Sequence, residues 1–555
     1  KIKLTKQKIT KPKINILNVS IFVFLVILVI TSLIGVNFAK SFWSVFERMT
    51  GLLTLFHLYA FFVVLVGVFR ERKHWERIIV VSILVGVLIC FFAWISKEPA
   101  TRGGSTIGNT SFMAGYLLFN IFFAIILFFT KSGSWKIFSA STLAILVAGL
   151  FISIEPCRGA IGAFFIGLFI LGFNYLMFYL FFSGKGQLKR LAYVIIVLLI
   201  LGGIGILQLD FVKKRIIEEW YGSSIQSRMV VWNMAFEGWK ERFWLGWGQE
   251  NFNVPFAKYF DPSLPLSGDI WYDRVHNVVL DTAITSGILG LMSYLAIFGV
   301  AIVGLLRVCP KVIERKNLLF PLGMISLLIA YFIQNLFVFD MISSYMIFFL
   351  SLAFVSFLIT PKTQENQPVA PPSQMNSLKI FAGAILIVIP LLTLYFGNIQ
   401  VAQASRYTLR GLSLPSEQAI PAFKKALAVS PISQFETREQ LSIRMNELGY
   451  QPIKDLELFN QELKFTEEEL KKTLIKYPDF RLYLFLGRFY NNVYQFTGNP
   501  ENLDLAIKAL EKSSELSPKN QQAYWSLAQV KLFQAKREEA ITLLKKAVDL
   551  EPRFG

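Results

Sequence analysis

The sequence is poor in the residues that build disulfides and metal centres. It has three cysteines and three histidines in 555 residues. Cys90, Cys157 and Cys309 stand alone in the chain, so neither a disulfide framework nor a metal cluster is indicated. No Asp-x-Asp motif or acidic cluster argues for a metal ion. We therefore expect no metal and no cofactor.

Charge is also scarce within the long apolar runs of the first 397 residues. Hydrophobic residues make up 54% of the chain and 53 residues are Phe. This composition excludes a protein that is soluble along its whole length. Apolar runs of roughly 17–25 residues predict transmembrane helices. We expect eleven, near residues 15–35, 50–69, 78–95, 111–130, 137–154, 160–182, 191–207, 277–306, 318–337, 342–360 and 379–397. The first run is too long for a signal peptide and has no small-residue cleavage site, so we expect it to remain as a span.

The distribution of basic residues predicts the orientation of these spans. With the N-terminus in the cytoplasm, the cytoplasmic segments carry 21 Lys and Arg. The short segments on the other face carry five, which are Lys40, Arg48, Lys97, Arg102 and Arg158. This asymmetry follows the positive-inside rule and predicts a multi-pass protein of the inner or plasma membrane. The net charge of +19 then indicates contact with an anionic lipid bilayer, not with nucleic acid.

The chain is predicted to be all-α and to have two parts. Residues 15–397 form a polytopic helical bundle, with a large extracytoplasmic loop at 208–275 and a Pro-rich linker at 361–377. Residues 398–555 are more hydrophilic, and eleven spans place them on the same outer side as the loop. We expect this tail to be a helical domain of the tetratricopeptide type.

The tail contains a repeat. Pro518 and Pro552 are 34 residues apart, which is the period of a tetratricopeptide repeat. Small and apolar residues recur where such repeats pack their helices: Tyr524, Leu527, Ala528, Ala540, Leu544 and Ala547, with Leu486, Gly487, Tyr490, Ala506 and Leu510 upstream. A third, more degenerate unit is predicted at 419–431. Repeat tails usually bind partners, so we expect a protein partner; generic helical hairpins are the alternative.

Polar and ionisable residues inside or beside membrane spans cost free energy, so their presence needs a structural or functional explanation. The predicted topology places them on or near one outer face: Arg102, Asn109, Glu155, Arg158, Arg228, Arg274, His276, Asn277, Asp281 and Asp340. In the long loop, residues 226–244 predict an amphipathic helix with an aromatic row suited to the headgroup layer. Glycines in GWGQENF, residues 246–252, then end this helix.

The order of these motifs resembles the O-antigen ligase and polymerase superfamily. The matching elements are CRGA at 157–160, SRMVVW at 227–232, GWGQENF at 246–252, HNVVLDTAITSGILG at 276–290, GNTSFMAGYL at 108–117 and NLFVFD at 335–340. Thr110 stands where many relatives have a proline, and Val278 stands where many have a second histidine or an aromatic residue. The resemblance implies an enzyme that moves a glycan from a polyprenyl-pyrophosphate donor to an acceptor outside the cytoplasm.

That reaction assigns roles to three residues. Pyrophosphate leaves with growing negative charge, and arginine stays charged and forks onto phosphate oxygens. Arg158 and Arg228 are therefore predicted to neutralise the pyrophosphate. His276 is predicted to be the general base that takes the proton of the acceptor hydroxyl. The dipole of the helix that follows should keep its ring neutral.

Further residues are predicted to bind substrate: Arg102, Asn109, Arg274, Asn277 and Asp281. Asp281 is also expected to orient His276. Each site residue has a structural alternative, such as an interfacial cap for His276, a snorkelling anchor for Arg158 or a solvated loop charge for Arg228. Asp340 is predicted to be a structural helix cap.

The leading hypothesis is a ligase that transfers lipid-linked glycan to an unidentified lipid, glycan or protein acceptor. A polymerase of the same superfamily and a protein O-oligosaccharyltransferase are alternatives within the family. A transporter or a membrane scaffold whose repeat tail recruits partners is the alternative from another class. Transporters tend to show duplicated spans and charges at the bilayer midplane, and neither pattern is evident in the sequence.

Overall fold

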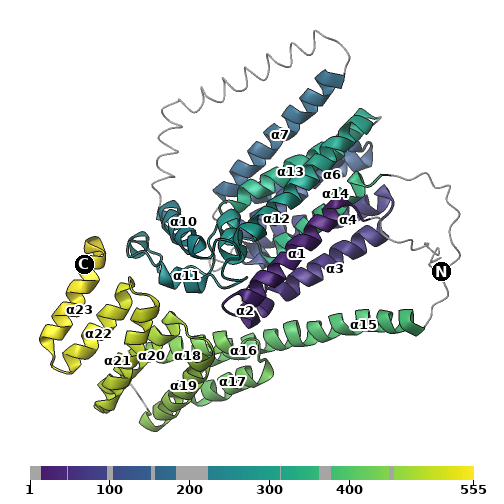
Figure 1. The fold of residues 1–555 in the computed structure, drawn as a ribbon. Coiled ribbons are helices and arrows are strands. Elements are labelled where there is room, and N and C mark those ends of the chain that lie inside the picture. Colours follow the sequence, from purple (N-terminus) through teal and green to yellow (C-terminus); the bar gives the residue numbers. More distant parts are fainter. Residues whose placement is uncertain are drawn as a thin grey trace.

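The computed structural model describes residues 14–46, 48–96, 104–151, 157–182, 223–312, 314–361, 377–448 and 455–554. Within these ranges the chain is helical throughout and contains no strand, which confirms the predicted all-α class. Figure 1 shows a bundle of long helices with a second helical body, the tail, beside one end of it.

The long helices of the bundle follow the apolar runs. They are α1 (Ile16–Ile34), α3 (Leu52–Val68), α4 (Arg72–Ser96), α5 (Thr110–Thr130), α6 (Ser134–Phe151), α7 (Arg158–Phe182), α12 (Val278–Val308), α13 (Leu319–Asn335), α14 (Ile342–Ile359) and α15 (Ser377–Leu394). In the described part of the chain, nine helical stretches are long and apolar enough to span a membrane, and α3 is a shorter apolar helix. The seventh predicted span, at 191–207, lies outside the described residues, as does most of the predicted linker.

The core of the bundle is built by α5, α13 and α14. Almost every side chain along α5 is buried, and its Phe119 packs on Tyr331 of α13 with ring centroids 4.8 Å apart. By contrast, α1, α7 and α15 keep large apolar side chains exposed along much of their length. Such apolar exposure on a long helix is what contact with lipid requires.

Helix α12 is broken in its first half, at Gly287. Gly287 has φ 66° and ψ −171°, a conformation that is essentially restricted to glycine. Residues 243–248 of the long loop bind the groups freed by the break: Trp247 and Gly248 donate to the carbonyls of Ile284 and Thr285, and Ile288 donates to Phe243. The predicted span at 277–306 is confirmed as one candidate membrane-spanning stretch, Val278–Lys311, but the loop completes the hydrogen bonding of its helix at a break that the sequence did not predict.

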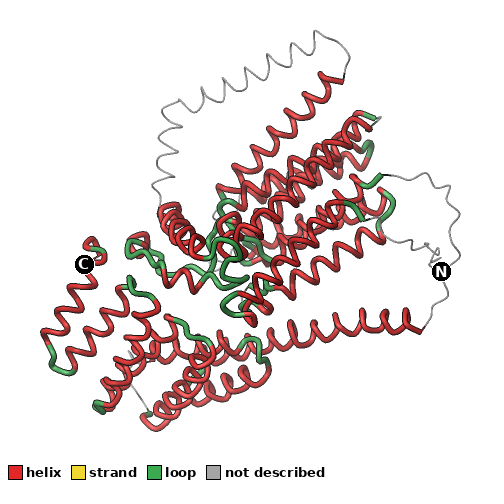
Figure 2. Tube along the Cα trace, viewed as in Figure 1, coloured by secondary structure: helices red, strands yellow, loops and turns green. Residues whose placement is uncertain are grey.

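The loop's amphipathic helix is confirmed as α10 (Ser223–Glu241). Its buried face consists of small and aliphatic residues, Ser227, Val231, Met234 and Ala235, whereas Phe236 of the predicted aromatic row is 45% exposed. Two short helices follow nearby, α2 (Phe38–Trp43) after α1 and α11 (Asn253–Lys258) after α10. Figure 2 shows that the loops cluster at this end of the bundle, which we call the site end, facing the tail.

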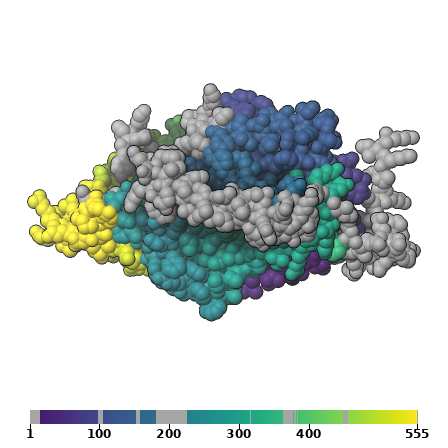
Figure 3. Space-filling view, turned by 90° about the horizontal axis from the view of Figure 1, so that it is seen from above, coloured from purple at the N-terminus to yellow at the C-terminus, as the bar shows by residue number. Residues whose placement is uncertain are grey.

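The tail is a series of packed helices: α16 (Gln400–Ser413), α17 (Ser416–Val429), α18 (Gln434–Leu448), α19 (Leu456–Lys476), α20 (Phe480–Thr497), α21 (Glu501–Leu516), α22 (Gln521–Phe533) and α23 (Arg537–Leu550). A Cβ on Gly487 would lie 2.4 Å from Leu510, so α20 and α21 pack as closely as a repeat requires. Ala540 and Ala547 are buried as predicted, whereas Leu544 is exposed. Figure 3 shows the last repeat projecting beyond the bundle.

The tail is joined to the membrane part in two ways. A helix runs without a loop from α15 through a π-helical segment, Tyr395–Ile399, into α16. The tail also packs on the long loop: Phe480 joins the loop's apolar cluster, and Arg481 lies over the ring of Trp271 at 4.2 Å. Ser517 and Gln521 donate to the loop carbonyls of Ala257 and Pro262. The loop and the tail are thus one packed unit at the site end.

Candidate functional site

His276 lies in the turn between the long loop and α12. The side chain of Asn277 caps α12 by accepting from the N–H groups of Val279 and Leu280 at 3.0 and 3.1 Å. Just before this cap, His276 adopts φ 57°, a left-handed conformation that is uncommon for a residue with a Cβ. The turn aims the imidazole edge-on between Tyr272 and Phe339, with ring centroids 5.1 and 4.9 Å away.

The hydrogen bonding of His276 indicates which nitrogen is basic. Nδ1 lies 3.0 Å from the carbonyl oxygen of Arg274. Because a carbonyl oxygen only accepts, Nδ1 carries the hydrogen in this contact and Nε2 of the neutral ring holds the lone pair. Burial, together with the positive charges of Arg228 and Arg48, lowers the pKa of His276 to about 4. The ring is therefore neutral at physiological pH, as predicted, although burial and not a helix dipole is the main cause.

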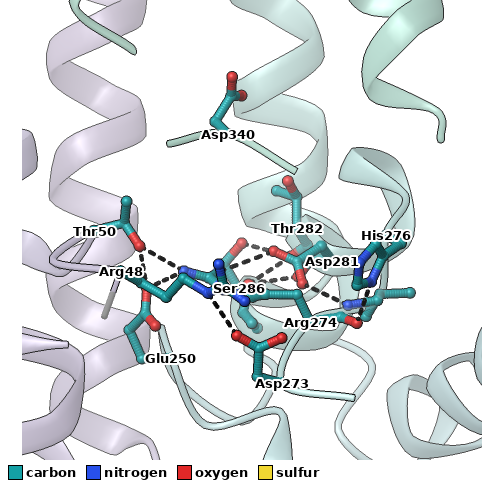
Figure 4. A network of polar contacts seen from close by, with 12 residues as sticks. Arg48, Thr50, Glu250, Asp273, Arg274, His276, Asp281, Thr282, Ser286 and Asp340 are labelled. Carbon is teal, nitrogen blue, oxygen red and sulfur yellow. Dashed lines mark hydrogen bonds and ion pairs between the residues drawn. The ribbon is translucent and has the colours of Figure 1, made fainter. Parts of the chain in front are cut away.

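The backbone that carries His276 is fixed by a buried guanidinium. Arg274 is 5% exposed and forms ion pairs with Glu250 and, at 3.1 Å, with Asp281. Thr50 also accepts from Arg274 at 2.8 Å and donates to Glu250 at 3.0 Å. Burial opposes the charge of Arg274, but the two carboxylates raise its pKa above the ordinary value. Figure 4 shows this network joining α12, the loop and the segment before α3.

The network corrects one expectation. Asp281 was predicted to orient His276, but its carboxylate accepts from Arg274 and from the backbone N–H of Val275 at 3.3 Å. The predicted pairing of Asp281 with the ring is therefore wrong. Arg274 and Asp281 are held in the protein interior, and this arrangement supports a positioning role for them. The caps formed by Asn277 and Asn109 are likewise structural, because Asn109 accepts from Ser111 at the start of α5 at 2.8 Å.

A second ion pair lies beside the ring. Arg48 binds Asp273 at 2.7 Å, and its guanidinium lies over the ring of Phe339 at 4.9 Å. Burial raises the pKa of Asp273, but the charge and hydrogen bond of Arg48 lower it below the usual range. His276 is thus next to the ion pair of Arg48 and Asp273.

Arg228 is brought to the same place by α10. The indole of Trp232 donates to the carbonyl of Val275 at 3.1 Å, and Tyr272 donates to Ser227 at 2.8 Å. These contacts hold the first turns of α10 against residues 272–275. Arg228, the neighbour of Ser227, is partly exposed and close enough for its charge to lower the pKa of His276. The predicted association of Arg228 with His276 is consistent with this geometry.

Arg158 is the first residue of α7 and its side chain is exposed at the site end. The adjacent Gly159 faces Phe337, with 3.6 Å between an added Cβ and the Phe337 Cβ atom. Phe337 in turn contacts Trp232, one helical turn after Arg228, with ring centroids 6.4 Å apart. The structure thus places Arg158 on the Arg228 side of the site through Phe337. Arg102 lies outside the described residues.

Asp340 has the structural role that was predicted. It accepts from Tyr331 at 2.6 Å, Asn335 at 2.9 Å and Ser344 at 2.8 Å. These three bonds tie the end of α13 to the start of α14. Asp340 lies apart from the Arg274 network in Figure 4.

Several residues near the site were missed from the sequence. Glu250, Asp273 and Thr50 are ordinary polar loop residues, and nothing in their spacing relates them to Arg274. Phe339 was visible only as part of the NLFVFD motif. Arg48 was counted as a basic residue of the outer face, and this predicted location was the signal in the sequence that it could lie near the site. In the described residues, no group of three or more His, Cys, Asp or Glu is arranged to hold a metal ion.

The fold and the site define a multi-pass helical membrane protein with a histidine and arginines gathered at one end of its bundle. Comparison with protein families shows that residues 143–295 match the model of the O-antigen ligase family and residues 521–554 match the tetratricopeptide repeat. The first match includes Arg158, Arg228 and His276. No curated protein matches the chain. These matches confirm the resemblance inferred from the motifs and support a ligase- or polymerase-type glycosyltransferase.

Proposed function

We propose that the protein transfers a glycan from a polyprenyl-pyrophosphate carrier to an acceptor hydroxyl outside the cytoplasm, without a metal ion. One observation carries this proposal: a neutral imidazole with Nε2 as its basic nitrogen lies beside Arg228 in a region that matches O-antigen ligases. A base and an anion-binding group side by side are what such a transfer needs.

Each group has a defined task in the reaction. Arg228 and Arg158 bind the pyrophosphate oxygens of the donor at the membrane surface. Nε2 of His276 takes the proton from the acceptor hydroxyl, whose oxygen forms the new bond to the anomeric carbon. The bond from that carbon to the pyrophosphate oxygen breaks, and the electron pair leaves with the polyprenyl pyrophosphate. The arginines stabilise the charge that develops, each by about 3–4 kcal/mol as for comparable donors elsewhere.

The orientation of the bundle agrees with this scheme. The helix ends opposite the site end carry basic residues, such as Arg72 at the start of α4, Lys131 after α5 and Lys311 after α12. By the positive-inside rule that end faces the cytoplasm. The site end, with the loop and the tail, then faces the side of the membrane opposite the cytoplasm. Lipid-linked glycans are used on that side.

Ligase, polymerase and protein glycosylation share this chemistry and differ in the acceptor. A polymerase lengthens the lipid-linked chain, whereas a ligase or a protein oligosaccharyltransferase moves it to another molecule. We favour a separate acceptor, because the tail is packed onto the site loop and gives the site end a large second binding surface.

The proposal is tested in membrane vesicles loaded with radiolabelled lipid-linked glycan. The variants His276→Ala, Arg228→Ala and Arg158→Ala are expected to fold and to lose transfer by about 10²–10³-fold each. His57→Ala and Lys240→Ala are matched controls: His57 lies on α3 and binds Thr393, and Lys240 lies on α10 and binds the exposed Glu237. Transfer at wild-type rates by the three site variants would overturn the proposal.

A further inference from the structure

Two adjoining hollows lie where the tail meets the site end. The larger has a volume of about 610 Å³ and the smaller about 200 Å³, and both are lined by Lys40, Val45, Asn253, Phe435, Glu436 and Asp479. We call them together the junction cavity. One wall comes from α2 and the loop, and the other from α18 and the start of α20, so the cavity exists only while the tail is docked. The larger volume falls in the usual range of small-molecule sites.

A buried carboxylate of the tail faces this cavity with one oxygen unused. Glu436 is 7% exposed. Its Oε1 accepts from the backbone N–H of Phe46 at 3.3 Å, whereas Oε2 has no hydrogen-bond partner in the described part of the protein. A buried polar atom without a partner costs about 1–3 kcal/mol. A ligand that donates a hydrogen to Oε2 would remove this cost.

Lys40 supplies the complementary group on the opposite wall. Its Nζ donates to Asn253 at 2.8 Å, and an ammonium group has three hydrogens to donate. Asn253 is itself fixed by donating to Asp479 of the tail at 3.0 Å. Above about pH 7, where the Glu436 carboxyl is ionised, the cavity therefore offers a fixed hydrogen-bond acceptor, Glu436, and a fixed donor, Lys40, from the two bodies that enclose it.

The charges around the smaller hollow select the chemistry of the ligand. Three of its acidic side chains are already paired, Glu250 with Arg274, Asp273 with Arg48 and Glu439 with Arg481. Lys40, Glu436 and Asp479 remain, so the hollow offers no large net charge to a charged ligand. A hydroxyl group both donates and accepts, so a neutral chain rich in hydroxyls satisfies Glu436 and Lys40 together.

The cavity also lies near the segment that carries the proposed base. Asp273 lines the smaller hollow and is three residues from His276, a distance of at most ~10 Å along an extended chain. Arg228 approaches the same segment through α10 and Tyr272. Donor pyrophosphate at Arg228 and a ligand in the junction cavity would therefore both be within reach of His276.

We propose that the junction cavity is the acceptor subsite and that it binds a neutral, hydroxyl-rich glycan chain between the tail and the membrane part. Oε2 of Glu436 accepts a sugar hydroxyl, and Lys40 donates to a neighbouring sugar oxygen. The next sugar along the chain then presents its hydroxyl to His276. This inference rests on the proposed function, whose donor site it leaves unchanged.

The test is transfer in vesicles as a function of acceptor concentration. The probe is the total glycolipid and polysaccharide extract of the host envelope, titrated against labelled lipid-linked glycan. Glu436→Gln keeps an oxygen for the Phe46 N–H but replaces Oε2 by an NH₂ group that cannot accept. Val45→Trp fills the cavity from the membrane side with an apolar side chain and leaves Glu436 and Lys40 unchanged in sequence.

Both variants are expected to raise the acceptor KM at least tenfold, with kcat and the donor KM within twofold of wild type. The control Glu447→Gln lies on the exposed face of the same helix, α18, and should change nothing. Trypsin cleavage patterns identical to wild type confirm that the tail is docked in each variant.

The possible failures are distinguishable. Absence of transfer by the wild-type protein would reject the proposed function itself. Wild-type transfer with an unchanged acceptor KM in both cavity variants would reject the acceptor subsite alone. A fall in kcat without a change in KM, or a change in the donor KM, would assign the cavity a structural role. Loss of acceptor capacity after protease treatment of the extract would identify a protein acceptor and overturn the glycan assignment.

Discussion

The Nδ1 atom of His276 lies 3.0 Å from the carbonyl oxygen of Arg274. The same residue, Arg274, holds its guanidinium against Glu250 and Asp281 in the protein interior. The Arg274 guanidinium is therefore occupied by two carboxylates of the protein itself. It fixes the peptide carbonyl that selects the tautomer of the proposed base.

The first prediction concerns pH. Because the pKa of His276 is lowered to about 4, kcat/KM is expected to be flat between about pH 5 and pH 8 and to fall below about pH 4 as the ring is protonated. Arg48→Gln removes a positive charge that lowers this pKa and also leaves Asp273 unpaired, and both effects favour imidazolium. Its acid limb should therefore move to higher pH. The measurement is initial rate against pH at low donor concentration, and a limb that stays in place would contradict the assignment of His276 as base.

The second prediction concerns the buried network. Arg274→Ala leaves two carboxylates without their counter-ion, so we expect a loss of about 3–5 kcal/mol in the free energy of unfolding. The triple variant Arg274→Met, Glu250→Gln, Asp281→Asn removes all three charges and should be more stable than Arg274→Ala alone. Melting temperatures measured in detergent test this order of stability. Equal melting temperatures for Arg274→Ala and wild type would show that the ion pairs contribute nothing.

The third prediction concerns the break in α12. A Cβ on Gly287 would lie 2.1 Å from the carbonyl oxygen of Trp244, in addition to the strain of φ 66°. Gly287→Ala is therefore expected to lower stability by at least about 2 kcal/mol and to expose the loop to protease. Gly299→Ala, in the same helix with open space around it, is the control and should be neutral. If both variants behaved alike, the break would not depend on glycine.

The fourth prediction concerns tail docking. Burial, with a smaller contribution from the charge of Glu439, raises the pKa of Glu436 to about 7, although Lys40 opposes this shift. The folded state thus binds a proton that the undocked carboxyl releases near pH 4.5. The associated stability is complete below about pH 4.5 and is lost as pH rises through 7. At about 1.4 kcal/mol per pKa unit, the difference is about 3 kcal/mol.

This prediction is measured as the melting temperature of wild type minus that of Glu436→Gln, at pH 5.5 and at pH 8. The difference should favour wild type more at the lower pH, because the amide does not titrate. Other titrating groups shift both proteins and cancel. A difference that is independent of pH would show that Glu436 is ionised throughout.

The spans were readable from the sequence because lipid imposes a length and a composition on each of them. The prediction of 111–130 for α5 (Thr110–Thr130) differs by one residue. The break at Gly287 was missed because Gly-x-x-Gly in an apolar run is compatible with a continuous helix. The backbone groups freed by the break find their hydrogen-bond partners in residues 243–248, about forty positions earlier in the chain.

The site was partly predictable for a similar reason. The topology alone placed Arg158, Arg228 and His276 at one end of the bundle, and this placement did not depend on side-chain geometry. The partner of Asp281 did depend on side-chain geometry. The left-handed turn at His276 directs the ring away from Asp281, and Arg274 contacts the Asp281 carboxylate instead. The sequence did not predict this turn, because a histidine gives no indication of a left-handed backbone conformation. The docking of Phe480 and Arg481 around Trp271 joins segments about 210 residues apart and was equally hidden.

The break in α12 has a consequence for biogenesis. Val36, at the end of the first span, donates to the carbonyl of Trp247, and Trp247 donates to Ile284. These three segments leave the ribosome at widely separated times. The hydrogen bond of Val36 therefore forms only after the loop has been made, and that of Trp247 only after the start of α12 has followed. Water can bind the exposed Val36 amide meanwhile, and chains truncated before residue 284 are expected to leave the Trp247 amide without its partner.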